Sequence, residues 1–365
     1  MSRKKIVILV PYCPLPADTG GKMEMMKHLN VLRDLGDCTI LSANRRPVGA
    51  GWDDENTRKM RDLGFNVVLR DTLMNPLQSA GMAYASVCKA LGLEKAFGHS
   101  NPYHRYAFPL SWWRKHTEGA DLVVTNYSYW SWLPANCPKA CVLLDLWSNY
   151  MWEGTKREAK DLGECDRVFV ISRSEEDQLR AMGVTQSFWT PPAIPEEEFP
   201  VTGEIGLVGS NSIFNREGLA WLGSADAVEP KIRVYGKLAA AADAPLFTKV
   251  GTYSDNNQPY RECGIVLFTT VMGMGVQIKT IEALAGGRAI IARRGAVRGL
   301  PLEPKGWIEV DTPQEMISAA RKLRDDEGLR NRQSAAAREY YRRNLDSAKI
   351  LASLRQEYEK LLKNA

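Results

Sequence analysis

The sequence shows one pattern twice: short apolar, β-branched runs alternate with stretches of helical periodicity. Strands that alternate with helices are typical of parallel, doubly wound sheets. We therefore expect two α/β domains, one in each half of the chain. The strand-like runs lie at residues 5–10, 38–43, 65–70, 120–126, 139–146 and 166–172, and then at 204–210, 231–236, 264–270, 288–292 and 306–310.

A proline-rich segment, "TPPAIPEEEFP", separates the two series and holds four prolines in eleven residues. Proline cannot continue a helix or donate to a strand ladder, so this segment is predicted to be a linker beside a cleft. The expected domains are 1–190 and 201–340, joined by a linker at 191–200. A C-terminal helix, 341–365, could pack back on the first domain.

Helix signals mark the start of the C-terminal region. In "DTPQE", Thr312 is expected to cap a helix, with Pro313 at its first position and Glu315 completing a capping box. From there to the end the chain is predicted to be helical and highly charged.

Composition limits the class of protein. With 365 residues, 44% hydrophobic and 25% charged, the chain suits a soluble protein of two domains. The net charge of +5 would suit an anionic ligand or membrane headgroups, but it decides nothing alone. Seven scattered cysteines include no CxxC pair, and only Ile6 to Val10 are continuously apolar near the start. We expect a cytoplasmic protein that could contact the inner face of a membrane.

Three loops follow predicted strands and lead into helices, where parallel sheets bind ligands. Gly20 and Gly21 open the first helix and would let a backbone approach an anion; a tight turn without a ligand is the alternative. The second loop ends its strand with Gly209, Ser210 and Asn211 before a helix that is expected to begin at Asn215 or Arg216. Arg216 could bind phosphate or lie in solvent.

The third loop belongs to "GMGVQIKTIEALAGGRAII", residues 273–291. Its helix should begin near Gln277, which places Lys279 in the first turn, where a cation helps only if an anion is bound. Glu282 shares the face of Lys279 and could accept hydrogen bonds from a ribose diol. The alternative is an exposed Lys–Glu pair worth a few tenths of a kcal/mol.

Four segments, in order, resemble motifs of nucleotide-sugar glycosyltransferases with two Rossmann-like domains, the GT-B fold of family 4 and its relatives. They are "PLPADTGGKMEMMKHLNVLRDLG", "DRVFVISRSEEDQLRAMGV", "EIGLVGSNSIFNREGLAWL" and "GMGVQIKTIEALAGGRAIIARRGAVRGL". The resemblance spans nearly the whole chain and is weakest between Leu73 and His116. It implies two Rossmann-like doubly wound parallel-sheet domains facing a cleft, with C-terminal helices.

The resemblance also implies roles for individual residues. Glu282 would bind the ribose, Gly275 and Val276 would donate backbone hydrogen bonds to the donor, and Lys279 would contact the diphosphate. Gly20 and Gly21 would face the donor from the first domain.

This chain departs from the family at several positions. The family's second glutamate is replaced by Met274, and the arginine and lysine that commonly grip the diphosphate fall at Ser210 and Arg216. Lys279 could substitute for the missing cation. The sequence has no Asp-x-Asp, which suits a metal-independent enzyme that needs no cofactor besides its co-substrate, a nucleotide-diphosphate sugar.

Catalysis and acceptor binding are assigned to the first domain. Where relatives place a histidine, this chain has Asp145 in "VLLDLWSNYMW", which could deprotonate an acceptor hydroxyl, bind the acceptor or cap a helix. A divergent aromatic and basic segment is expected on the acceptor side, although helices completing the domain core would explain it as well. Its candidate residues are His104, Arg105 and Trp113, with Tyr127 just beyond.

We therefore expect a glycosyltransferase that moves a hexosyl or related sugar onto an acceptor hydroxyl, in a cell-surface glycan or a lipid-linked saccharide. A modified DNA base is an alternative acceptor, because the basic aromatic segment permits contact with nucleic acid. A nucleotide-sugar epimerase or a glycosyl phosphorylase would use the same fold. A two-lobed sugar-binding protein is the non-enzymatic alternative.

Overall fold

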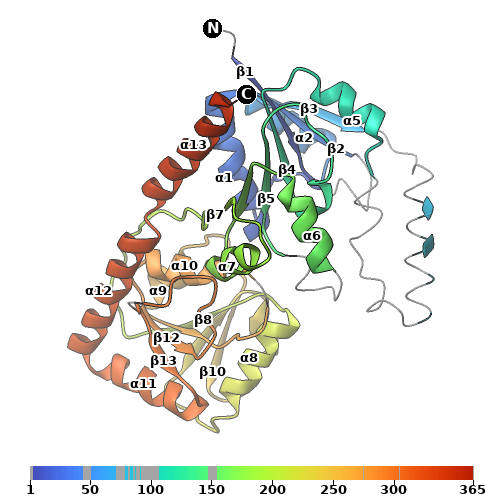
Figure 1. Ribbon diagram of the computed structural model, residues 1–365. Helices are drawn as coiled ribbons and strands as arrows, with labels where there is room; N and C mark the ends of the chain where they lie inside the picture. Colours follow the sequence, from blue (N-terminus) through green and yellow to red (C-terminus); the bar gives the residue numbers. More distant parts are fainter. Residues whose placement is uncertain are drawn as a thin grey trace. The chain divides into compact units, whose positions relative to one another are not determined.

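The computed structural model describes residues 3–43, 51–70, 79–80, 83–84, 87, 91, 107–146, 154–273, 275–303 and 305–364. These residues belong to two compact units (Figure 1). Unit 1 comprises Met1–Pro191 and Leu351–Ala365, and unit 2 comprises Pro192–Ile350. Each unit contains one parallel sheet with helices, as the alternating pattern predicts.

The sheet of unit 1 has seven strands in the order β3-β2-β1-β4-β5-β6-β7, and every pair is parallel. Strand order reverses direction at β1 and β4, so the loops after these two strands leave toward opposite faces. The elements are β1 (Lys4–Leu9), α1 (Gly20–Leu35), β2 (Gly36–Ala43), α2 (Asp54–Asp62), β3 (Asn66–Arg70), α5 (Leu110–Thr117), β4 (Leu122–Asn126), the 3₁₀ turn η1 (Ser128–Trp130), β5 (Lys139–Leu143), α6 (Gly154–Gly163), β6 (Arg167–Val170), α7 (Arg173–Ala181) and β7 (Ser187–Trp189).

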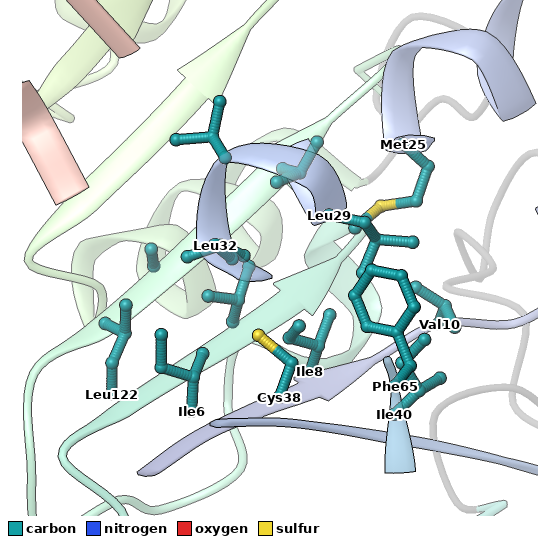
Figure 2. Close-up of a cluster of buried hydrophobic side chains, with 14 of the residues drawn as sticks. Ile6, Ile8, Val10, Met25, Leu29, Leu32, Cys38, Ile40, Phe65 and Leu122 are labelled. Carbon is teal, nitrogen blue, oxygen red and sulfur yellow. The ribbon is translucent and has the colours of Figure 1, made fainter. Parts of the chain in front are cut away.

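Both faces of β1 are buried, which explains its nearly continuous apolar sequence. Ile6 and Ile8 pack with α1 residues such as Leu29 on one face, as Figure 2 shows. On the other face, Val7 and Leu9 belong to a cluster that includes Trp113 and Trp130. The strand therefore lies at the centre of two apolar layers.

The sheet of unit 2 has six parallel strands in the order β10-β9-β8-β11-β12-β13. Its order reverses at β8 and β11. The elements are β8 (Ile205–Val208), α8 (Ile213–Gly223), β9 (Ile232–Tyr235), the 3₁₀ turn η3 (Lys237–Ala241), β10 (Phe247–Gly251), α9 (Gln258–Glu262), β11 (Ile265–Phe268), α10 (Ile278–Ala285), β12 (Ala289–Arg293), β13 (Ile308–Val310), α11 (Pro313–Asp325), α12 (Glu327–Asn344) and α13 (Ser347–Lys363), whose last residues belong to unit 1.

Helix starts follow their capping residues. The predicted capping box at α11 is confirmed, because Thr312 and Glu315 each bond the backbone of the other. Helix α8 begins earlier than the expected Asn215 or Arg216, since the Ser212 side chain accepts a hydrogen bond from Asn215 N. That serine within "SNSIFNR" is an N-cap.

Two buried cations hold the ends of the proline-rich segment within their own units. In unit 1, Lys27 Nζ donates to the carbonyl oxygens of Thr190 and Pro191 at 3.1 and 2.9 Å. In unit 2, the fully buried Arg288 donates to the carbonyl oxygens of Phe199 and Pro200 at 3.0 and 2.9 Å. These bonds supply partners for carbonyls that prolines leave outside regular structure.

Leu29 provides a test of the unit 1 core, because it is fully buried between α1 and the sheet. We expect Leu29→Ala to lower the free energy of unfolding by about 2–5 kcal/mol, measured by urea denaturation, through lost apolar contact and a residual cavity. Leu63→Ala, at a position that is 37% exposed, is the control. Equal losses in the two variants would contradict this assignment of the core.

Candidate functional site

The carboxyl ends of β8 and β11 form the point of unit 2 at which strand order reverses, and this is where open parallel sheets bind ligands. The loop after β8 leads into α8, and the loop after β11 leads into α10. Gly218 lets α8 lie close to the loop after β11, because a Cβ on Gly218 would be 2.6 Å from Thr269 Oγ1. The two helix starts are thereby held at one edge of the sheet.

Lys279 lies in the first turn of α10, as predicted, and reaches across to the neighbouring loop. Its Nζ donates to the carbonyl oxygen of Val208 and to Asn215 Oδ1, each at 3.1 Å. The same ammonium lies 6.0 Å from the ring centroid of Phe268. Its two hydrogen-bond acceptors are uncharged, so Lys279 is not half of a simple surface ion pair.

The pKa of Lys279 is lowered to about 8: burial is the largest cause, the positive charge of Arg298 is the second, and Glu282 opposes the shift. A cation that is costly to keep charged in the empty site gains from a bound anion. The electrostatics therefore favour a negatively charged ligand beside Lys279.

Glu282 lies one turn along the same helix and is held by a tyrosine. Tyr260 Oη donates to Glu282 Oε2 at 2.7 Å and lies 3.2 Å from the Lys279 carbonyl oxygen. Burial raises the pKa of Glu282, with the Tyr260 hydrogen bond and the Lys279 charge opposing it. Burial also raises the pKa of Tyr253, and the charge of the nearby Glu282 carboxylate adds to that rise.

The glycine loop before α10 is held by Gln277, which caps the helix. Gln277 Nε2 donates to the carbonyl oxygens of Thr270 and Ala296 at 3.0 and 2.8 Å. Gly275 has a φ of 63°, in the left-handed region that favours glycine, and Val276 beside it is buried. Met274 lies outside the described residues.

Asn215 joins the two loops, and sequence reasoning had considered it only as a helix start. Its Nδ2 donates to the Ser210 carbonyl and hydroxyl oxygens at 3.0 and 3.1 Å, while its Oδ1 accepts from Lys279 and from Thr270 Oγ1. Ser210 and Asn211 are exposed at this edge, and Gly209 is half-buried beneath them. Arg216 is also exposed, so its contact with phosphate remains a prediction.

A second group of predicted residues meets in unit 1, at the carboxyl ends of β1, β4 and β5. Gly21, at the start of α1, packs against Leu144, which directly precedes Asp145: a Cβ on Gly21 would lie 3.0 Å from Leu144 Cδ1. Tyr12 lies 3.3 Å from the Gly21 carbonyl oxygen, to which its hydroxyl donates. Burial raises the pKa of Tyr12, and Tyr127, Glu24 and Asp145 add to the rise.

Helix α1 begins at Gly20, so Gly20 and Gly21 open it as expected. Its N-cap, Thr19, makes no side-chain capping bond. The predicted residues Gly20, Gly21, Tyr127 and Asp145 thus belong to one edge of the unit 1 sheet, with Asp145 half-buried. A catalytic role for Asp145 remains a prediction.

Glu175, in the first turn of α7, is a residue that sequence reasoning missed. It is 2% exposed and accepts a hydrogen bond from Leu146 N at 3.2 Å, directly after Asp145. Burial raises the pKa of Glu175 to about 7, with the Leu146 N–H opposing it and the carboxylates of Asp145 and Glu158 adding to it. Acidic residues are ordinary at helix starts, so "SRSEED" carried no sign of burial.

The expected acceptor side is only partly described. His104 and Arg105 lie outside the described residues. The assignment of Trp113 to a sugar-binding surface is wrong: the side chain is fully buried, and its Nε1 donates to the Pro134 carbonyl oxygen at 2.7 Å. Its indole completes the apolar layer under the sheet, as the core alternative predicted.

Two absences hold for the described part of the chain. No three histidine, cysteine, aspartate or glutamate side chains there are grouped so that they could hold a metal ion. None of the helices in the described ranges has the length and apolar character needed to span a membrane.

By sequence, neither a family profile nor a curated protein matches the chain. Solved structures do. HepE of Anabaena, in complex with UDP-glucose, has a TM-score of 0.67 and 12% identity over 98% of this chain and 99% of its own. A glycosyltransferase from Rickettsia africae gives 0.62 and 13%, and sucrose-phosphate synthase from Thermosynechococcus elongatus gives 0.65 and 14%, each over 100% of both chains.

At these identities the comparisons establish the fold. This chain has the two parallel-sheet α/β units of the GT-B fold, as the sequence resemblance implied.

The lowered pKa of Lys279 predicts a pH-dependent stability. Between about pH 8 and 10.5 the unfolded chain keeps a proton on Lys279 that the folded chain releases, so folding is favoured as pH rises through this window. The free energy of unfolding of the native chain should therefore rise relative to that of Lys279→Met across the window and stay parallel to it below pH 8. Urea denaturation from pH 7 to pH 10 measures the difference. Curves that stay parallel throughout would contradict the burial of this charge.

Proposed function

We propose that the protein is a glycosyltransferase that moves a sugar from a nucleotide-diphosphate donor to an acceptor hydroxyl. The observation that carries this proposal is the pair formed by Lys279 and Glu282 on one face of α10, at the edge where the strand order of unit 2 reverses. A half-buried cation and a positioned carboxylate one turn apart match a diphosphate joined to a ribose.

In the proposed complex, the ribose hydroxyls donate to the Glu282 carboxylate, whose orientation the Tyr260 hydroxyl supports. Lys279 and the N-terminal end of α10 face the diphosphate, and Gly275 and Val276 offer it backbone N–H groups. Structures of HepE with bound UDP and UDP-glucose support this choice of ligand, because HepE shares the fold.

Transfer breaks the bond between the anomeric carbon and the diphosphate oxygen and forms a bond to the acceptor oxygen. The nucleoside diphosphate leaves with the bonding electron pair, and Lys279 with the α10 N-terminus would stabilise its developing charge. We propose that this fixed positive charge allows transfer without a metal ion. The acceptor hydroxyl proton would pass to Asp145, a role suited to inversion at the anomeric carbon.

The donor sugar and the acceptor are narrower proposals. Met274 replaces a carboxylate that relatives place near the donor sugar, so we propose that this enzyme holds the sugar hydroxyls through other groups. We propose a cell-surface glycan or a lipid-linked saccharide as acceptor, reached by peripheral contact with the inner face of a membrane. A modified DNA base is the alternative that salt-sensitive duplex binding would reveal.

Donor binding is tested by a thermal-shift screen of UDP-, GDP-, ADP- and dTDP-sugars. We expect one nucleotide series to stabilise the native chain, because a ligand that binds only the folded state raises its melting temperature. Glu282→Ala and Lys279→Ala should respond to that series much less. Glu339→Ala, which removes a carboxylate that is 71% exposed on α12, is the matched control and should respond like the native chain.

The donor-site proposal is wrong if no nucleotide sugar stabilises the native chain. It is also wrong if Glu282→Ala and Lys279→Ala are both stabilised as much as the native chain is. Product analysis then separates the activities of this fold. Sugar release that depends on an acceptor supports transfer. An isomerised donor without acceptor indicates an epimerase, and a sugar phosphate made from free phosphate indicates a phosphorylase.

Asp145→Asn tests the proposed base separately. We expect turnover to fall by about 10²–10⁴-fold, because asparagine cannot accept the acceptor proton. The nucleotide-sugar thermal shift should be preserved, since Lys279 and Glu282, which are proposed to bind the nucleotide, lie in unit 2. Turnover near the native value would remove Asp145 from the chemistry and leave it as a binding or structural residue.

A further inference from the structure

We propose that Arg298, which lies within the last of the four motifs but has no role implied there, is a second diphosphate-binding cation that acts together with Lys279. This inference rests on the proposed function, because it specifies how the same donor site holds its anionic group. Arg298 lies in the loop after β12, one strand away from the β11 loop that leads to Lys279 and two strands away from the β8 loop that leads to Asn215.

Hydrogen bonding brings Arg298 to the end of β11. Its Nη1 donates to the Thr270 carbonyl oxygen at 3.1 Å, the same oxygen that accepts from Gln277 Nε2 at 3.0 Å. Gln277 is the N-cap of α10, and Lys279 lies in that helix's first turn. Arg298 therefore reaches from the loop after β12 to the loop that leads into α10, whose first turn contains Lys279.

Gly273 leaves room for the guanidinium. A Cβ at this position would lie 2.7 Å from Arg298 Nη2, so the end of the arginine side chain would have to shift. Gly273 also has a φ of 110°, which other residues rarely adopt. The positive φ is therefore the reason that glycine is favoured here, and the guanidinium of Arg298 lies beside it.

The two cations affect each other directly. The Arg298 charge is, after burial, the largest cause of the lowered pKa of Lys279. The Thr270 carbonyl oxygen accepts a hydrogen bond from Arg298, and Val208 and Asn215 contribute oxygens to Lys279. Bringing two like charges together in a partly buried site costs free energy, which a bound dianion offsets.

The two cation types suit a diphosphate better than a monophosphate. A guanidinium presents parallel N–H groups that can bind one phosphate in bidentate fashion, whereas an ammonium acts as a compact point charge. With one cation for each phosphate, loss of Arg298 should weaken binding of a nucleoside diphosphate more than binding of the monophosphate. A nucleoside without phosphate should be unaffected.

A purely structural role is the competing explanation, because Arg298 also fixes the end of β11 through Thr270. If that were its only role, its removal would disturb the nucleoside and ribose contacts along with the phosphate contacts. The dependence of binding on phosphate number distinguishes the two roles.

The experiment is isothermal titration of the full chain with a nucleoside and its mono- and diphosphate, with the base chosen by the donor screen. We expect Arg298→Gln to weaken diphosphate binding by about 10- to 100-fold, as for loss of a charged hydrogen bond, with nucleoside binding unchanged. Arg298→Lys should recover part of the lost diphosphate affinity and leave the affinity for the nucleoside unchanged. The matched control, Arg294→Gln, removes an exposed arginine paired with Asp311 and Glu309 on the same segment and should bind like the native chain.

The outcomes separate the two proposals. Equal weakening of nucleoside, monophosphate and diphosphate, or no weakening of any, would overturn the role of Arg298 while Glu282→Ala and Lys279→Ala still support the donor site. Absence of nucleotide binding in the native chain would overturn both. If Arg298→Gln unfolds at too low a temperature to be titrated, Arg298→Lys is titrated with the same three ligands. This variant keeps the charge and loses only the bidentate geometry, so the same dependence on phosphate number decides between the two roles.

Discussion

Parallel pairing of β8 with β11 is the constraint on which the rest of unit 2 depends. Because parallel strands end at the same edge, this pairing brings together loops that are more than fifty residues apart in sequence. Asn215 follows β8 and Lys279 follows β11, and the hydrogen bond between them spans 64 positions of sequence. Strand β12 adds a third loop at this edge and with it Arg298.

The surroundings of Lys279 disfavour its positive charge. Lys279 is half-buried near the Phe268 ring, bonded to neutral oxygens and repelled by Arg298. A site of this kind binds an anion with groups that are already oriented, so little reorganisation accompanies binding. The cost appears as lower stability of the empty protein. This is the trade-off expected when a rigid sheet edge is used for recognition.

Local signals predicted local structure well. The capping box of Thr312 and Glu315, the start of α10 near Gln277 and the strands themselves were readable because capping and periodicity involve neighbouring residues. Errors arose where a residue's environment comes from distant parts of the chain. Trp113 resembled a sugar-stacking surface residue, but packing under the sheet buries it completely. Glu175 resembled an ordinary carboxylate at a helix start, but it is buried and accepts a hydrogen bond from Leu146 N, 29 positions away.

By itself, the sequence determined that the chain forms two parallel α/β units, and it singled out Lys279 and Glu282 as one face of one helix. Both follow from periodicity and spacing, which are local properties. Only the tertiary structure decided that Tyr260 orients Glu282, that Asn215 bonds Lys279 and that Arg298 lies beside the glycine loop. Strand order sets these neighbours, and strand order depends on which strands pair, an energetic outcome of the whole core that no single motif records.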